Sequence, residues 1–151
     1  MIQRIQSLYM LASTILGVVC LCFPLGKFFD DLGLSATLYN LWMRISDNDT
    51  YSFAPWALFA ILLLVTVLTF LDIFLFRQRA LQMRILVFCI ILLAGYYAWL
   101  AFFAVMQTRE GFTFKPSVTA ALPFVCIVLD YLAFRGILKD EMLIRSLDRL
   151  R

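Results

Sequence analysis

Histidine is absent from this sequence. Its absence excludes haem ligation by histidine, histidine-containing zinc sites, Ser-His or Cys-His catalysis and the usual pH switch near neutrality. The four cysteines, Cys20, Cys22, Cys89 and Cys126, all lie within apolar runs. Because the one close pair, Cys20 and Cys22, lacks the C-x-x-C spacing of a redox motif, we interpret all four as small buried hydrophobic residues.

Charged residues are also scarce. They make up 15% of the chain and hydrophobic residues 64%, whereas soluble domains have about 25% and about 45–50%. A soluble domain of 151 residues has too much surface for its volume to hide this excess of apolar side chains. The composition therefore predicts a membrane protein, and it argues against nucleic-acid binders, secreted mini-proteins and ordinary cytosolic enzymes.

Four stretches are long and apolar enough to cross a bilayer, which needs about 20 residues of helix. They cover residues 8–25, 54–76, 85–106 and 117–134. Backbone groups have no water partner in lipid, so we predict an all-α membrane protein in which residues 1–151 form one four-helix transmembrane domain. Pro123 predicts a kink in the fourth helix. Two small-xxx-small pairs, Ser13 with Gly17 and Ala94 with Ala98, predict close helix approach.

Lysine and arginine are distributed unevenly between the two sides of the membrane. One side has nine of the thirteen: Arg4, Arg77, Arg79, Arg84, Arg135, Lys139, Arg145, Arg149 and Arg151. The other side has four: Lys27, Arg44, Arg109 and Lys115. Since short cytoplasmic segments collect positive charge, we expect both termini in the cytoplasm.

The first external loop, residues 26–53, is too long and too aromatic for a simple helix connection. Residues 36–45 alternate in part, but both faces of the alternation are largely apolar, so the period does not separate strand from helix. We favour a short strand or β-hairpin over the outer ends of the helices, with the second external loop, residues 107–116, pairing with it. The alternative is an interfacial cap whose aromatic rings lie at headgroup level.

Residues 135–151 read as a cytoplasmic amphipathic tail helix. Leu143, Leu147 and Leu150 form an apolar stripe. Four cations lie on an adjacent arc: Arg135, Lys139, Arg145 and Arg149. The helix either lies on the anionic inner leaflet or docks a cytoplasmic partner or a second copy of the chain.

Asp72 and Asp130 are the charged residues inside the predicted spans. Both occur in the pattern Leu-Asp-x-x-x-Phe-Arg, which suggests a duplicated helical hairpin. A carboxylate in hydrocarbon needs a partner. We therefore predict interhelical ion pairs of these acids with Arg4 and Arg84, at the starts of the neighbouring helices. The alternative is that the two acids carry protons or cations.

Three segments carry a family resemblance: Met1-Ile2-Gln3-Arg4-Ile5-Gln6-Ser7-Leu8-Tyr9, the inner loop over residues 74–84, and the ending Lys139-Asp140-Glu141-Met142-Leu143-Ile144-Arg145-Ser146-Leu147-Asp148-Arg149-Leu150-Arg151. They resemble the bacterial membrane-protein family called domain of unknown function 4293. The resemblance spans the whole chain. It implies a four-helix protein of the bacterial inner membrane, and it implies no catalytic residue.

No nucleophile–base pair or metal-ligand cluster is apparent in the sequence, so we expect neither an enzyme nor a bound cofactor or metal. The leading interpretation is an integral membrane protein that acts by contact, as a scaffold or accessory subunit. Its partners would be membrane lipids and a protein or second copy, not nucleic acid. The alternative is a small ion- or proton-coupled transporter or channel that uses Asp72 and Asp130.

Overall fold

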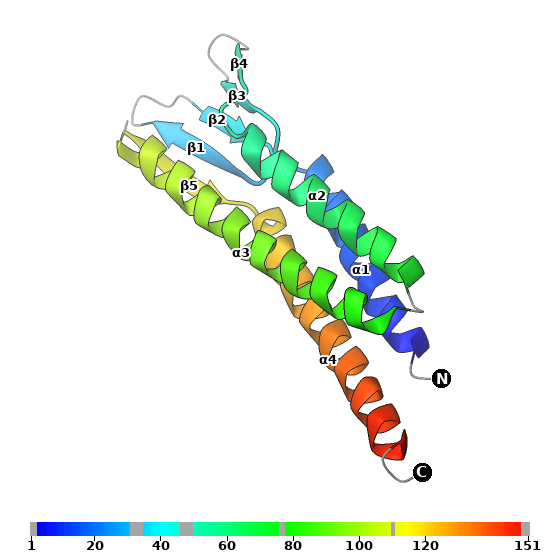
Figure 1. The fold of residues 1–151 in the computed structure, drawn as a ribbon. Coiled ribbons are helices and arrows are strands. Elements are labelled where there is room, and N and C mark those ends of the chain that lie inside the picture. Colours follow the sequence, from blue (N-terminus) through cyan, green and yellow to red (C-terminus); the bar gives the residue numbers. More distant parts are fainter. Residues whose placement is uncertain (1–2, 31–34, 46–49, 76–77, 110, 149–151) are drawn as a thin grey trace.

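The chain folds into a bundle of four long helices with a small sheet at one end (Figure 1). The computed structural model describes residues 3–30, 35–45, 50–75, 78–109 and 111–148. For six of these it describes the backbone only: Gln3, Arg4, Arg109, Arg145, Leu147 and Asp148. The first helix begins and the last helix ends at the end of the bundle opposite the sheet (Figure 1). We call this the terminal end, and the other the sheet end.

The four helices are α1 (Gln3–Cys22), α2 (Trp56–Asp72), α3 (Arg79–Arg109) and α4 (Leu122–Asp148). Four segments, each built around one of these helices, are long and apolar enough to cross a membrane, which confirms the prediction of four such spans. The segment around α2 extends three residues past the helix, to Leu75. At 1.5 Å per residue, the 31 residues of α3 span about 46 Å and the 17 of α2 about 26 Å. The extra length of α3 lies at the sheet end, beside the last strand (Figure 1).

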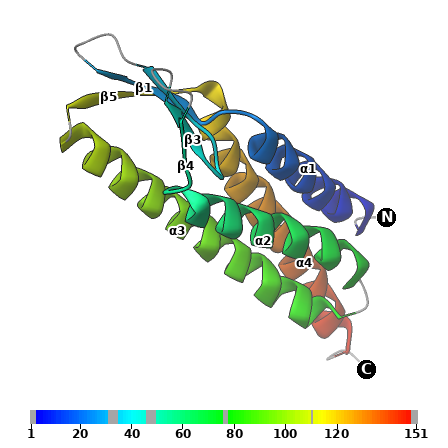
Figure 2. The same cartoon turned by 90° about the horizontal axis from the view of Figure 1, so that it is seen from above.

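The helices form a ring in which α1 and α3 each pack against α2 and α4 (Figure 2). At Gly17, an added Cβ would lie 2.6 Å from the Thr66 hydroxyl oxygen, so α1 and α2 approach closely there. This agrees with the small-residue pair predicted on α1. The pair predicted on α3 is different, because Ala94 and Ala98 are exposed and lie away from the helix interfaces.

The sheet has five antiparallel strands in the order β4-β3-β2-β1-β5. They are β1 (Gly26–Asp30), β2 (Ser35–Leu38), β3 (Met43–Ile45), β4 (Thr50–Ser52) and β5 (Phe112–Pro116). The structure thus confirms strands in the first loop and their pairing with the second. It differs from the prediction in extent, because a single strand or hairpin was expected and the first loop contributes four strands.

One face of the sheet covers the ends of the helices. Phe28 and Leu38 point to this face and are fully buried. They belong to the same apolar cluster as Leu58 of α2 and Leu93 of α3. The sheet and the bundle therefore share one core, and burial of alternate strand residues fixes which face turns inward.

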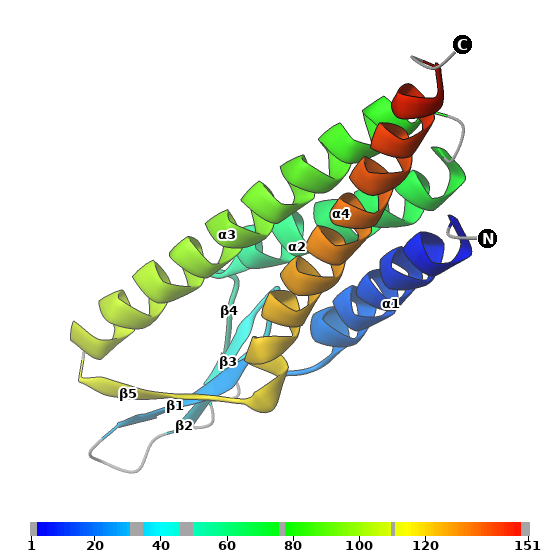
Figure 3. The same ribbon diagram turned by 90° about the horizontal axis from the view of Figure 1, so that it is seen from below.

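The predicted tail is not a separate helix. It is the straight continuation of α4, which runs without a break from Leu122 to Asp148 and extends beyond α1 at the terminal end (Figure 3). Ala133 and Ile137 are buried on both sides of the predicted boundary, because the continuous helix still packs on α1. The described part of the tail therefore shares the axis of α4 and does not turn away from the bundle.

The start of the fourth helix also differs from the prediction. Residues Val118–Ala121 form a 3₁₀ turn, called η2, and α4 begins at Leu122. Pro123 is thus the second residue of α4 and does not interrupt its interior. In the first turn of a helix the missing N–H of proline has no intrahelical partner to lose, so the expected kink is absent there.

Candidate functional site

Asp72 and Asp130 lie inside the bundle and are fully buried. Asp72 is the last residue of α2 and Asp130 lies in α4. The two carboxyl groups are close enough to interact electrostatically. Among the described residues, no hydrogen-bond partner contacts any of their four carboxyl oxygens. The structure therefore brings together two buried acids from different helices and provides neither with a described partner.

Polar side chains of the other two helices surround the acids. The Gln82 amide of α3 donates to the backbone oxygen of Asp72 at 3.2 Å, and its nitrogen lies 3.5 Å from the sulfur of Met10. Ser13 of α1 lies beside Asp130. All four helices thus contribute to one buried polar cluster, which we call the acid cluster: Ser13, Asp72, Gln82 and Asp130.

The predicted ion pairs are not formed by Arg84. Arg84 is exposed, because the inward-facing residue of α3 at this level is Gln82. The side chain of Arg4 lies outside the described residues, so its pairing stays a prediction. Arg79 and Arg135 do not pair with the acids either, since the carboxyl oxygens have no partner among the side chains that the structure describes.

The duplicated pattern around the acids does not produce equivalent helix ends. After Asp72 the chain enters a 3₁₀ turn, η1 (Ile73–Leu75), whereas after Asp130 helix α4 continues to Asp148. What the two copies share is the burial of the acid.

A second buried polar contact, not predicted from the sequence, lies at the sheet end. Asn40 sits in the turn between β2 and β3 and is fully buried. Its amide donates to the backbone oxygen of Cys20 at 2.7 Å, and it accepts a hydrogen bond from the Tyr96 hydroxyl at 2.8 Å. The sequence signal that could have indicated this contact is Asn40 itself, a single amide side chain between apolar and aromatic neighbours.

The terminal end has its own contact between α1 and α4. The Gln6 amide donates to the Asp140 carboxylate at 2.8 Å. A Cβ at Gly136 would lie 3.0 Å from the Gln6 side chain, so α1 and α4 approach closely there. This contact also was not predicted, although Gly136 marks the position.

The described tail residues expose both charge and apolar surface. Arg135 and Lys139 are exposed. Met142, Leu143 and Ile144 are 56%, 50% and 45% exposed. Of the predicted apolar stripe, the structure describes the side chain of Leu143, and those of Leu147 and Leu150 lie outside the described residues. The side chains of Arg145 and Arg149, from the predicted basic arc, also lie outside them.

The cysteines agree with the structural interpretation at three positions. Cys20, Cys89 and Cys126 are buried, whereas Cys22 is exposed, and all four are free thiols. Within the described part of the chain, no three His, Cys, Asp or Glu side chains are grouped as a metal site would require.

A family model described as domain of unknown function (DUF4293) matches residues 2–150. The chain belongs to the DUF4293 family. This confirms the resemblance drawn from the two ends and the inner loop. No curated protein matches the chain. Since the DUF4293 description names no activity, a function for this member must come from its own geometry.

Proposed function

We propose that this protein is a non-enzymatic, multi-pass protein of the bacterial inner membrane that acts by contact, as a scaffold or accessory subunit. In this proposal both termini are cytoplasmic and the sheet lies on the opposite side. The observation that carries the proposal is the projecting end of α4, which presents Met142, Leu143 and Ile144.

The position of these three residues argues for a protein partner. They follow the exposed cations Arg135 and Lys139, which belong at the headgroup level of a cytoplasmic boundary. An α4 that crosses the membrane without a break carries them further from the hydrocarbon with each turn. Consecutive exposed apolar side chains beyond a basic boundary are typical of a contact surface.

Site-specific photocrosslinking tests this proposal. A benzophenone amino acid is placed at position 143 and, as a matched control, at Leu63, an exposed leucine in the middle of α2, which has no charged residue before Asp72. We expect position 143 to form one discrete protein adduct in cells and position 63 to form none. Equal adducts at both positions, or none at positions 142, 143 and 144, would contradict the proposal.

A second candidate, proton or cation movement, is favoured by the acid cluster. The polar groups do not stop at the acids: the Cys126 thiol donates to the Ser13 backbone oxygen, and Cys20, Tyr96 and Asn40 continue toward the sheet end. In proteoliposomes this candidate requires proton or cation uptake that Asp72→Asn abolishes and the control Asp140→Asn preserves. Wild-type vesicles without uptake would exclude it.

A further inference from the structure

Three cations form one row across the outward face of the sheet. Lys115 lies opposite Lys27, Lys27 opposite Thr37, and Thr37 opposite Arg44. Residues directly opposite each other in antiparallel strands share a face. Lys27, Arg44 and Lys115 are exposed, in contrast to the buried inner face. The fold thus collects three of the four cations that the sequence assigned to this side of the membrane.

Lys27 and Lys115 are a like-charged pair at adjacent positions of β1 and β5. Like charges directly opposite each other destabilise a sheet. The Lys115 ammonium nitrogen lies 5.1 Å from the centre of the Phe29 ring, on the same face. Both lysines and Phe29 line a hollow of about 280 Å³. An anion in this hollow would offset the repulsion between the two ammonium groups.

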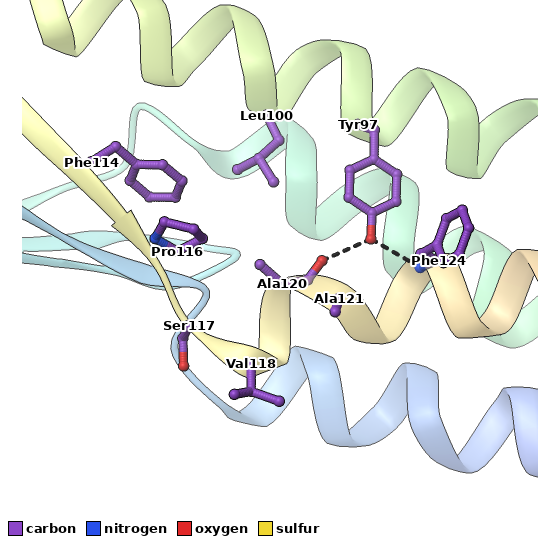
Figure 4. Close-up of a pocket in the computed structure, with 9 residues that line it drawn as sticks. All are labelled: Tyr97, Leu100, Phe114, Pro116, Ser117, Val118, Ala120, Ala121 and Phe124. Atoms are coloured by element: carbon purple, nitrogen blue, oxygen red, sulfur yellow. Dashed lines mark hydrogen bonds between the residues drawn. The ribbon is translucent and has the colours of Figure 1, made fainter.

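A larger apolar hollow, of about 600 Å³, adjoins the first. Pro116 and Ser117 line both. Its other walls come from α3, β5, η2 and α4 (Figure 4). The Tyr97 hydroxyl on this wall already makes two hydrogen bonds within the protein: it donates to the Ala120 backbone oxygen at 2.7 Å and accepts from the Phe124 backbone N–H at 2.9 Å. The hollow therefore offers mostly rings and aliphatic groups.

We propose that the two hollows together bind one anionic phospholipid from the leaflet at the sheet end. Its phosphate would lie between Lys27 and Lys115, and an acyl chain would lie along Leu100, Val118 and Phe124. Lysine is a common phosphate ligand in proteins, acting as a point charge.

Three observations favour a phospholipid over a soluble anion or a neutral lipid. The apolar hollow is bounded by α3 and α4, two helices apolar enough to cross the membrane, and Val118 and Phe124 at its edge are 86% and 60% exposed. The two lysines give the adjoining hollow a net positive charge, and no acidic residue is among the described residues that line either hollow. An amphiphile with one phosphate matches both parts at once, whereas an inorganic anion leaves the apolar part bare.

Native mass spectrometry of the full chain, delipidated in detergent, tests the proposal. The probes are dioleoyl phosphatidylglycerol, dioleoyl phosphatidylcholine and glycerol 3-phosphate. We expect phosphatidylglycerol to bind at least about tenfold more tightly than phosphatidylcholine, from two lysines near the headgroup. The Lys27→Gln/Lys115→Gln variant should remove this preference, and the control Arg135→Gln/Lys139→Gln, at the other end of the bundle, should keep it.

A third variant, Ala121→Trp, fills the apolar hollow while leaving both lysines in place. We expect it to weaken phosphatidylglycerol binding to the level of the lysine double variant. All substituted side chains are exposed, and an unchanged melting temperature without lipid would show that folding is intact.

Several results would overturn the proposal. Equal affinity for the two lipids would show that the protein does not select an anionic headgroup. Equal loss of phosphatidylglycerol binding in the lysine double variant and in its control would indicate general charge attraction without a defined site. Binding of glycerol 3-phosphate as tight as that of the lipid would show a soluble-anion site. Full lipid binding by Ala121→Trp would show that the chain does not use the hollow.

Discussion

At the residue scale, the bundle depends on a few buried polar side chains, each in a different situation. Asn40 makes hydrogen bonds to both α1 and α3, one through its amide nitrogen and one through its carbonyl oxygen. Asp72 and Asp130 are buried as deeply but have no described partner. A satisfied polar group stabilises a core, whereas an unsatisfied one costs free energy and persists for another reason. Substitutions at the two sites should therefore have opposite effects on stability.

Replacement of Asn40 by leucine should destabilise the protein. It removes the Asn40 partner of the buried Tyr96 hydroxyl and of the Cys20 carbonyl oxygen, at a cost of about 2–4 kcal/mol. We expect the melting temperature in detergent to fall by about 5–10 °C. Tyr96→Phe is the matched control, because it removes the hydroxyl but leaves the contact of Asn40 with Cys20 intact, and its loss should be smaller. No loss in Asn40→Leu would contradict the bridging role of Asn40.

The acids should tolerate neutral replacement. Because neither carboxyl group has a described partner, Asp72→Asn and Asp130→Asn remove no hydrogen bond or ion pair that the structure shows. We expect a melting temperature equal to or above that of the wild type, measured in the same detergent. Arg84→Gln should also be neutral, since Arg84 is exposed. A fall of more than about 5 °C for either acid would reveal a strong partner, for which Arg4 is the sequence-based candidate.

At the element scale, two glycines within the long helices lie in different surroundings. Gly17 lies where α1 meets α2, and a Cβ there would overlap the Thr66 hydroxyl. Gly95 lies on the open face of α3, with no atom within 4 Å of its added Cβ. The sequence alone does not distinguish these two positions, because both glycines lie within long apolar runs.

The two glycines give a matched pair of alanine variants. Gly17→Ala should lower the melting temperature by several degrees, because Thr66 must move or the helices must separate. Gly95→Ala should leave it unchanged or raise it, because alanine is favoured over glycine in a helix by about 1 kcal/mol. Equal effects of the two variants would contradict the described approach of α1 and α2.

At the scale of the whole molecule, the sequence predicted the features that depend on length and composition. Four apolar runs specify four long helices because each must satisfy its own backbone hydrogen bonds in lipid. Basic residues near the ends of the runs predicted a sidedness that the fold allows, with the start of α1 and the end of α4 at one end (Figure 1).

Features that depend on rotation and register were not predictable. Whether Arg84 or Gln82 points inward depends on the rotation of α3 about its axis, which the nearly uniform apolar run that follows them does not define. The strand count of the first loop was missed because both faces of its alternation are apolar. The row of Lys27, Arg44 and Lys115 requires the register of three strand pairings, which forms only in the folded sheet.

We infer that the four helices together cross a membrane an even number of times, leaving the sheet on one side and both termini on the other. Single-cysteine variants, in a chain whose native cysteines are replaced, test this arrangement. Thr113→Cys places an exposed thiol on β5, and Ser146→Cys places one near the end of α4. With a membrane-impermeant maleimide, intact spheroplasts should label position 113 and label position 146 only after permeabilisation. Labelling of both positions in intact spheroplasts would show that the sheet and the end of α4 lie on the same side of the membrane.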